Sequence, residues 1–367
     1  MTLNSVPTDA ALLDALKTVL DPETGRDLVS GKQIRNLRIE GGKVSFDVEL
    51  GYPARSLWPK LEADLAQAAR RVSGVTEVSV RFETRIVAHA VQRGVQLLPG
   101  VKNLIAVASG KGGVGKSTTA VNLALALMAE GAKVGVLDAD IYGPSQPTML
   151  GIEGRPDSAD GKTMEPMVGH GLQVMSIGFL IDEDQAMIWR GPMVTQALEQ
   201  LLRQTAWKDL DYLIVDMPPG TGDIQLTLAQ RVPVTGAVIV TTPQDIALID
   251  ARKGLKMFEK VSVPILGIVE NMAVYCCPNC GHSEHIFGAD GGKAMAAQYG
   301  VDYLGALPLE RSIREQTDAG RPTVVAAPDS ALAELYKAVA RKVAVKVAAQ
   351  AKDYSAKFPT ITVSKNT

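Results

Sequence analysis

The sequence predicts an α/β protein in which a doubly wound, mostly parallel sheet domain is preceded by a small α+β domain. Two patterns indicate this fold class. From Leu104 onward, short continuous apolar runs alternate with helical segments, as expected for parallel strands covered by helices on both faces. Before residue 84, helical and strand periods follow one another within a short stretch, which is typical of a small mixed unit. Hydrophobic residues make up 46% of the 367 residues, which is enough to form a core in each domain.

The first 83 residues carry the pattern of the small domain. Apolar residues at helical spacing predict a first helix that stops at Asp21. Alternating apolar residues on both sides of Gly41-Gly42 predict a β-hairpin, because this pair forms a tight turn. A second helical stripe and one more alternating strand follow. The expected order is therefore helix, two strands, helix, strand.

The chain is expected to divide into four parts. Weak periodicity ending in Pro99-Gly100 predicts a linker, and the composition near the C-terminus becomes rich in Lys and Ala and then polar. The expected parts are a small domain over 1–83, a linker over 84–102, the sheet domain over 103–345 and a tail over 346–367.

Polar residues follow several of the predicted parallel strands. Ligands of open α/β sheets bind beyond the carboxyl ends of the strands, so Asp138, Asp216 and Asn271 are expected to converge on a ligand. The candidate strands are Leu104–Ala108, Val134–Leu137, Leu172–Ile177, Tyr212–Val215, Ala237–Thr241, Ile265–Val269 and Tyr303–Ala306.

The stretch after the first of these strands matches the phosphate-binding pattern G-x-x-x-x-G-K-[ST] and opens a predicted helix. Its glycines let backbone N–H groups surround a phosphate, Lys116 reaches the β- and γ-phosphate oxygens, and Ser117 reaches Mg²⁺. The sheet domain is thus predicted to be a P-loop NTPase domain that binds ATP and Mg²⁺. The residues expected at the nucleotide are Gly110, Gly112, Gly113, Val114, Gly115, Lys116, Ser117 and Thr118.

All three cysteines, Cys276, Cys277 and Cys280, lie within five residues of one another. Such a cluster cannot join distant segments by disulfides and favours metal or redox chemistry instead. The C-x-x-C spacing of Cys277 and Cys280 supplies two of the four ligands of a tetrahedral zinc site or a [4Fe–4S] cluster. A second identical chain could supply the other pair, or His282 and His285 could complete a zinc site within one chain.

The phosphate loop contains a second lysine, Lys111, which a general P-loop does not need, so the stretch from Lys111 to Thr118 indicates a narrower class of ATPases. This stretch resembles the deviant Walker A motif of nucleotide-dependent dimerising ATPases, which include MinD, ParA and the nitrogenase iron protein. The resemblance implies that Lys111 reaches the nucleotide of a partner subunit and acts there in ATP hydrolysis. The alternative is a solvated surface lysine.

Two acidic strand ends resemble the switch I and Walker B regions of the same class. We expect Asp216 to hold Mg²⁺ through water, and Asp140 to position the attacking water. Asp138 is expected to be a partner on the metal side. Structural capping is the alternative role for Asp138 and Asp140. Asn271 matches the residue that reads the adenine base in these ATPases, and its amide can pair with a donor and an acceptor edge.

Beyond the ATPase motifs, the sequence resembles the Mrp/ApbC family of iron–sulfur carrier ATPases over residues 100–345. The resemblance implies an ATP-hydrolysing homodimer that holds a cluster, expected to be [4Fe–4S], between the Cys277 and Cys280 pairs of two subunits. It also implies iron–sulfur scaffold donors and apo-protein clients as partners. The stretches that carry it are Asp138–Ser145, Trp189–Met193, Asp216–Asp223, Glu270–Met272 and Cys277–Gly281.

Residues 8–83 resemble the small iron–sulfur assembly domain that is fused to many Mrp proteins. Such domains often carry a cysteine in the loop after the second strand. The corresponding loop, Gly51–Ser56, has none here, which favours docking of a client or partner over direct cluster handling.

Two other functions share the ATPase motifs. A MinD- or ParA-like ATPase for positioning or partitioning has no need for the cysteine pair, although the basic helical segment 331–352 could contact a membrane or DNA. A zinc-binding P-loop ATPase would use the cysteines without iron. A reductase like the nitrogenase iron protein places its cluster cysteines far apart, unlike this chain.

The overall composition narrows the expected partners and location. A net charge of −2 gives no nucleic-acid footprint, and no run of about 18 apolar residues is present. The first sixteen residues contain no Lys or Arg, so the n-region of a secretory signal is missing. A cytoplasmic protein with no nucleic-acid or membrane partner is expected.

Overall fold

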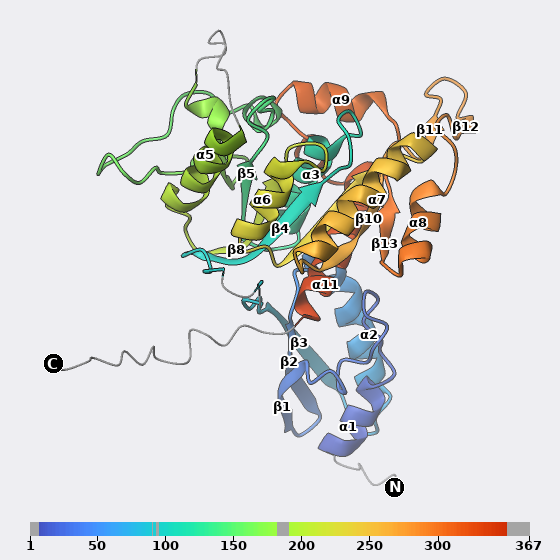
Figure 1. Cartoon of the computed structure of the whole chain (residues 1–367). Helices are drawn as coiled ribbons and strands as arrows, with labels where there is room; N and C mark the ends of the chain where they lie inside the picture. Colours follow the sequence, from blue (N-terminus) through green and yellow to red (C-terminus); the bar gives the residue numbers. More distant parts are fainter. Residues whose placement is uncertain (1–6, 90, 93–94, 182–190, 351–367) are drawn as a thin grey trace, which may run out of the picture.

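The computed structural model describes residues 7–89, 91–92, 95–181 and 191–350. The expected tail beyond residue 350 and the Trp189-Arg190 part of one family stretch lie outside the described residues. Figure 1 shows a large domain built around one sheet, with a smaller domain against one end of it. No helix in the described part of the chain is long and apolar enough to cross a membrane.

The small domain has the predicted order of elements, namely α1 (Asp9–Leu16), β1 (Ile34–Glu40), β2 (Lys43–Leu50), α2 (Trp58–Arg70) and β3 (Glu77–Thr84). The central strand β2 pairs antiparallel with β1 and parallel with β3. Glu40 pairs with Lys43, so Gly41-Gly42 forms the two-residue turn that the sequence predicts. Alternate residues of β2 are buried beneath the two helices, as the alternating apolar pattern of this strand predicts.

The large domain is an eight-stranded sheet in the order β13-β10-β9-β4-β8-β5-β7-β6. Every pair is parallel except β6 with β7, so the doubly wound architecture is confirmed. All seven predicted strands are present, and the unpredicted β6 is a three-residue edge strand whose polar surroundings give no periodic signal. The strands are β4 (Val101–Ala108), β5 (Val134–Asp138), β6 (Met167–Gly169), β7 (Leu172–Ser176), β8 (Leu210–Asp216), β9 (Gly236–Thr241), β10 (Ile265–Glu270) and β13 (Tyr303–Ala306).

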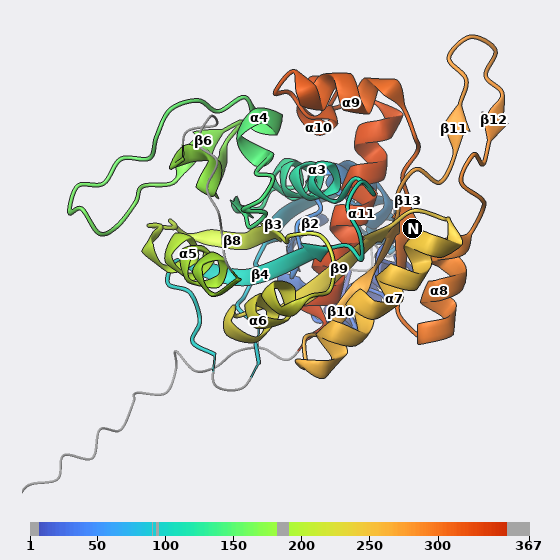
Figure 2. The same cartoon turned by 45° about the horizontal axis from the view of Figure 1, so that its top comes forward.

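Helices cover both faces of this sheet (Figure 2). On one face, α3 packs against α11, and α5, α6 and α7 lie on the other. The last helix continues to Ala348, past residue 345, because Ala344 and Val347 are still buried. The helices are α3 (Lys116–Ala129), α4 (Gln146–Leu150), α5 (Gly191–Gln204), α6 (Asp223–Arg231), α7 (Asp245–Lys260), α8 (Gly291–Tyr299), α9 (Arg311–Asp318), α10 (Thr323–Ala326) and α11 (Ala331–Ala348), with short 3₁₀ turns at Arg55–Leu57 and Ile177–Phe179.

The two domains meet at the carboxyl end of α3. Glu130 caps this helix and is fully buried. The loop Gly51–Ser56 of the small domain reaches it: the Ser56 backbone N–H and hydroxyl donate to the two Glu130 carboxylate oxygens at 2.9 and 2.6 Å. The Arg55 N–H donates to the Glu130 carbonyl at 3.1 Å, which satisfies one of the carbonyls that a helix end leaves unpaired.

Arg341 on α11, a buried cation, completes this contact between the domains. Its guanidinium donates to Glu130, to Glu23 of the small domain and to Glu334, each at 2.7 Å. Burial by itself would lower the pKa of Arg341, but the hydrogen bonds that it donates to the three carboxylates outweigh burial and raise the pKa. We call Arg341, Glu23, Glu130 and Ser56 the interdomain network.

Candidate functional site

The phosphate loop lies between β4 and α3, at the centre of the sheet. Two of its glycines are required by geometry. A Cβ on Gly110 would come 2.1 Å from the Asp250 backbone carbon of α7. Gly115 has φ +80°, and its Cβ would come 2.1 Å from Asn271 Nδ2. The loop therefore keeps the exposed backbone that a phosphate needs, packed against two other elements.

The lysine of the loop is held by an acidic strand end. Lys116 Nζ lies 2.5 Å from Asp216 Oδ1 at the end of β8 and 3.1 Å from the Ser117 hydroxyl. Lys116 is 6% exposed and Asp216 is fully buried. The three residues predicted for phosphate and Mg²⁺ handling thus come together around one point. A hydroxyl and a carboxylate are oxygen donors of the kind that Mg²⁺ prefers.

Asp138, at the end of β5, makes the contacts of a structural cap. Its Oδ1 accepts the Asp140 N–H at 3.1 Å, and its Oδ2 accepts the N–H groups of Ser145 and Gln146 at 2.9 and 3.0 Å. The Ser176 hydroxyl adds a fourth bond at 3.2 Å. Burial and the nearby Asp216 raise the pKa of Asp138. These contacts match the capping alternative, while a role beside the metal stays a prediction.

Asp140 and Lys111 are both partly exposed. The Asp140 side chain is partly buried, and this burial raises its pKa. Lys111 is partly exposed, and its carbonyl accepts the Ser109 hydroxyl at 2.9 Å. In the part of the chain that the structure describes, no hydrogen bond or ion pair holds the Lys111 ammonium. The predicted role of Lys111 in trans stays a prediction.

Asn271 packs against the phosphate loop. Its Nδ2 donates to the Val114 carbonyl at 2.9 Å, and its backbone N–H donates to Thr241 at 2.7 Å. The side chain is 8% exposed. In this structure the Asn271 amide supports the loop, and its predicted task of reading the base is untested.

Gln146 is a site residue that the sequence reasoning missed. It is fully buried at the start of α4, and its amide touches both Asp216 and α3. It directly follows the family stretch Asp138–Ser145, but a glutamine beside a proline carries no motif of its own.

The cysteines lie on a two-stranded hairpin, β11 (Tyr275–Cys276) and β12 (Ser283–Glu284), that extends away from the sheet (Figure 2). The turn is closed by the Gly281 N–H donating to the Cys277 carbonyl at 2.9 Å, and by the Cys277 N–H donating to His282 at 2.9 Å. Cys280 is exposed and Cys277 is partly exposed. Backbone N–H groups of Asn279 and Cys280 lower the pKa of Cys277, which favours the thiolate that binds metal.

The structure does not gather the ligands of a one-chain zinc site. His285 Nδ1 lies 2.6 Å from the Ala273 carbonyl, at the base of the hairpin. Among the described residues, no three His, Cys, Asp or Glu side chains come together as metal ligands. The predicted one-chain zinc site is therefore not assembled among the described residues.

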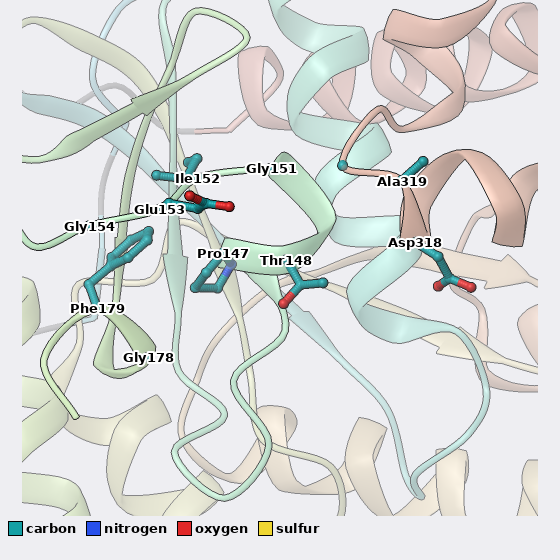
Figure 3. A pocket seen from close by; sticks show the side chains of 11 residues that line it. Pro147, Thr148, Gly151, Ile152, Glu153, Gly154, Gly178, Phe179, Asp318 and Ala319 are labelled. Atoms are coloured by element: carbon teal, nitrogen blue, oxygen red, sulfur yellow. The ribbon is translucent and has the colours of Figure 1, made fainter. Parts of the chain in front are cut away.

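The structure also contains a cavity of about 510 Å³ between α4 and the end of α9 (Figure 3). Pro147 and Thr148 line it on one side, and Asp318 and Ala319 on the other. None of the predicted site residues lines this cavity, so it is separate from the phosphate loop.

Comparisons with known proteins show which families this chain is similar to. Residues 100–344 match a family described as NUBPL iron-transfer P-loop NTPase, and residues 9–80 match one described as iron–sulfur cluster assembly protein. An iron–sulfur cluster carrier protein of Pseudomonas fragi is 60% identical over 278 residues, which cover 75% of this chain and 97% of that protein. The iron–sulfur cluster carrier protein of Escherichia coli K12 is 50% identical over 339 residues, 92% of each chain.

One solved structure has the same fold at clear sequence identity. The nucleotide-binding protein of Archaeoglobus fulgidus in complex with ADP is 38% identical, with a TM-score of 0.56. The match covers 65% of this chain and 93% of that one.

Proposed function

The chain belongs to the Mrp/ApbC-type iron–sulfur cluster carriers, which are P-loop NTPases with an N-terminal iron–sulfur assembly domain, and from this we propose a specific mode of action. Two chains form a homodimer that binds and hydrolyses ATP. The dimer holds one [4Fe–4S] cluster between its cysteine pairs and transfers the cluster to apo-proteins.

The incomplete thiol pair is the observation that carries this proposal. Cys277 and Cys280 lie at the tip of an exposed hairpin, and no third ligand approaches them within the described ranges. A [4Fe–4S] cluster takes four thiolates, so two chains related by a two-fold axis supply the full set. A cluster held at an exposed hairpin is accessible to a recipient protein, which suits a carrier.

The ATP site supports hydrolysis by residues from both subunits. Lys116 binds the β- and γ-phosphates. Ser117, and Asp216 through water, would hold Mg²⁺, which would neutralise charge on the phosphate oxygens. Asp140 orients the attacking water. Lys111, which lacks a partner among the described residues of its own chain, contacts the γ-phosphate in the other subunit.

The partners follow from the carrier role. A scaffold protein donates the cluster, and cytoplasmic apo-proteins receive it. The loop Gly51–Ser56 of the small domain is occupied by its contact with Glu130, so a docking partner meets another surface of that domain. A positioning or partitioning ATPase has no task for the cysteine hairpin, and we do not favour that function.

Metal stoichiometry and oligomeric state test the proposal directly. After anaerobic reconstitution, about four iron and four sulfide ions are expected per dimer. Sedimentation with an ATP analogue gives the size of the cluster-bound species. One zinc ion per monomer, or a full cluster on a monomer, would contradict the shared site.

Replacing Lys111 with alanine should reduce the rate constant of ATP hydrolysis by about 10³-fold and leave ATP affinity nearly unchanged. The reason is that a contact made across the dimer in the transition state adds little to ground-state binding. Steady-state kinetics and equilibrium binding of an ATP analogue separate the two effects. Lys116→Ala is the comparison, since that variant should lose binding itself. Equal loss of binding in both variants would argue against a role in trans.

A further inference from the structure

Gln146 connects three parts of the nucleotide site. Its Nε2 donates to Asp216 Oδ2 at 2.9 Å and to the Ser117 carbonyl of α3 at 3.2 Å. Its backbone N–H donates to Asp138 at 3.0 Å. The fully buried side chain therefore joins the end of β8 to the first turn of α3, and the backbone N–H of the same residue adds the end of β5.

The other half of the amide is unsatisfied. Gln146 Oε1 is buried and has no hydrogen-bond partner among the described residues. The amide cannot simply turn over, because its oxygen would then face the Asp216 carboxylate and the Ser117 carbonyl, both of which are acceptors. A buried polar atom without a partner is costly, so this oxygen is ready to accept a hydrogen bond from an incoming donor.

The two oxygens of Asp216 have different partners. Oδ1 pairs with Lys116, and Oδ2 accepts from Gln146. In a P-loop the lysine contacts phosphate when nucleotide binds, and it then no longer neutralises Asp216. Of the Asp216 side-chain contacts found in the described structure, the one with Gln146 then remains.

We propose that Gln146 is a positioning residue for magnesium-dependent nucleotide binding. It keeps the Asp216 carboxylate oriented after Lys116 turns to the phosphates, through the bond from its Nε2 to Asp216 Oδ2. This inference rests on the proposed ATP site and adds a residue that acts through Asp216.

The test is the gain in nucleotide affinity that Mg²⁺ provides. The dissociation constant of a slowly hydrolysed fluorescent ATP analogue is measured with Mg²⁺ and with EDTA, for the full chain and for Gln146→Met. We expect the dissociation constant in EDTA divided by that with Mg²⁺ to fall at least about tenfold in the variant, since a hydrogen bond to a charged group is lost. Affinity in EDTA should change little. If Gln146→Met does not fold, Gln146→Asn, whose amide is too short for both acceptors, should show the same loss.

Gln173→Met is the matched control. Gln173 also makes two hydrogen bonds, both with the Lys208 backbone, but on β7 and away from the phosphate loop. Its ratio should equal that of the wild type. A variant at Gln146 that keeps the wild-type ratio, or that loses equal affinity with and without Mg²⁺, would overturn the positioning role. Failure of the wild-type chain to bind the analogue would instead contradict the proposed ATP site.

Discussion

Replacing Cys277 or Cys280 with alanine is expected to abolish iron and sulfide binding after anaerobic reconstitution, with ATP affinity unchanged. Each substitution removes two of the four thiolates in a dimer, because both subunits carry it. The phosphate loop is built from other elements, so nucleotide binding should not respond. Iron and sulfide assays, visible absorbance and binding of an ATP analogue give the three measurements.

Cys276→Ala is the control for this prediction. Cys276 is exposed, like Cys280, but its sulfur lies 3.6 Å from the Gly281 carbonyl inside the hairpin, and the residue is adjacent in sequence to Cys277. This variant should retain the cluster. Loss of iron from all three variants to the same degree would mean that iron binding depends on the fold of the hairpin and not on the thiols of Cys277 and Cys280. Retention of iron in Cys277→Ala would remove the shared cluster site.

Arg341→Met is expected to lower the free energy of unfolding by about 3–5 kcal/mol, because breaking a buried ion pair leaves an uncompensated charge. Glu130 is fully buried and Glu23 nearly so, and both lose their cation in this variant. The negative end of the α3 dipole adds to the repulsion at Glu130. Urea denaturation of the full chain, followed by circular dichroism, measures the change.

Two further variants test the cause of that loss. Arg314→Met removes an exposed arginine that pairs with Asp318 and Glu315, and should cost less than about 1 kcal/mol. The double variant Arg341→Met, Glu130→Met should recover much of the stability, since an apolar pair can replace a buried ionic one. A single variant no less stable than Arg314→Met would show that the interdomain network contributes little to folding.

The fold could be predicted largely from local patterns. Buried parallel strands such as Val134–Leu137 are continuous apolar runs, and Gly41-Gly42 between alternating stretches admits a hairpin and little else. The edge strand β6 was not predicted, because three residues are too few to show a hydrophobic period. The observed pairing confirms the rest of the sheet.

The site was predictable only in part. The phosphate loop and Asp216 have a fixed spacing to their neighbours in sequence, and the structure brings them together. The hydrogen bonds of Asp138 depend on how the chain turns after β5, which the sequence does not encode as a motif. Gln146 acquires its partners from residues 29 and 70 positions away.

The interdomain network could not be predicted from the sequence either, because its residues also lie far apart in the chain. Arg341 and Glu23 are 318 positions apart, and Arg341 and Glu130 are 211 apart. Arg341 lies on a helix, Glu130 caps one and Glu23 lies in a turn, and charged residues at such positions are usually solvated. Only the folded arrangement shows that these charges are buried.

The P-loop helix α3 has one end at the phosphate loop and the other at the small domain, so a rigid element connects the two. Its 14 residues form a stiff rod about 21 Å long. Gly115 anchors it next to the incoming phosphates, and Glu130 anchors it to Ser56 and Arg341. The P-loop helix and the small domain are therefore in direct contact at Glu130, so any tilt or axial shift of α3 would act on the small domain without an intervening loop.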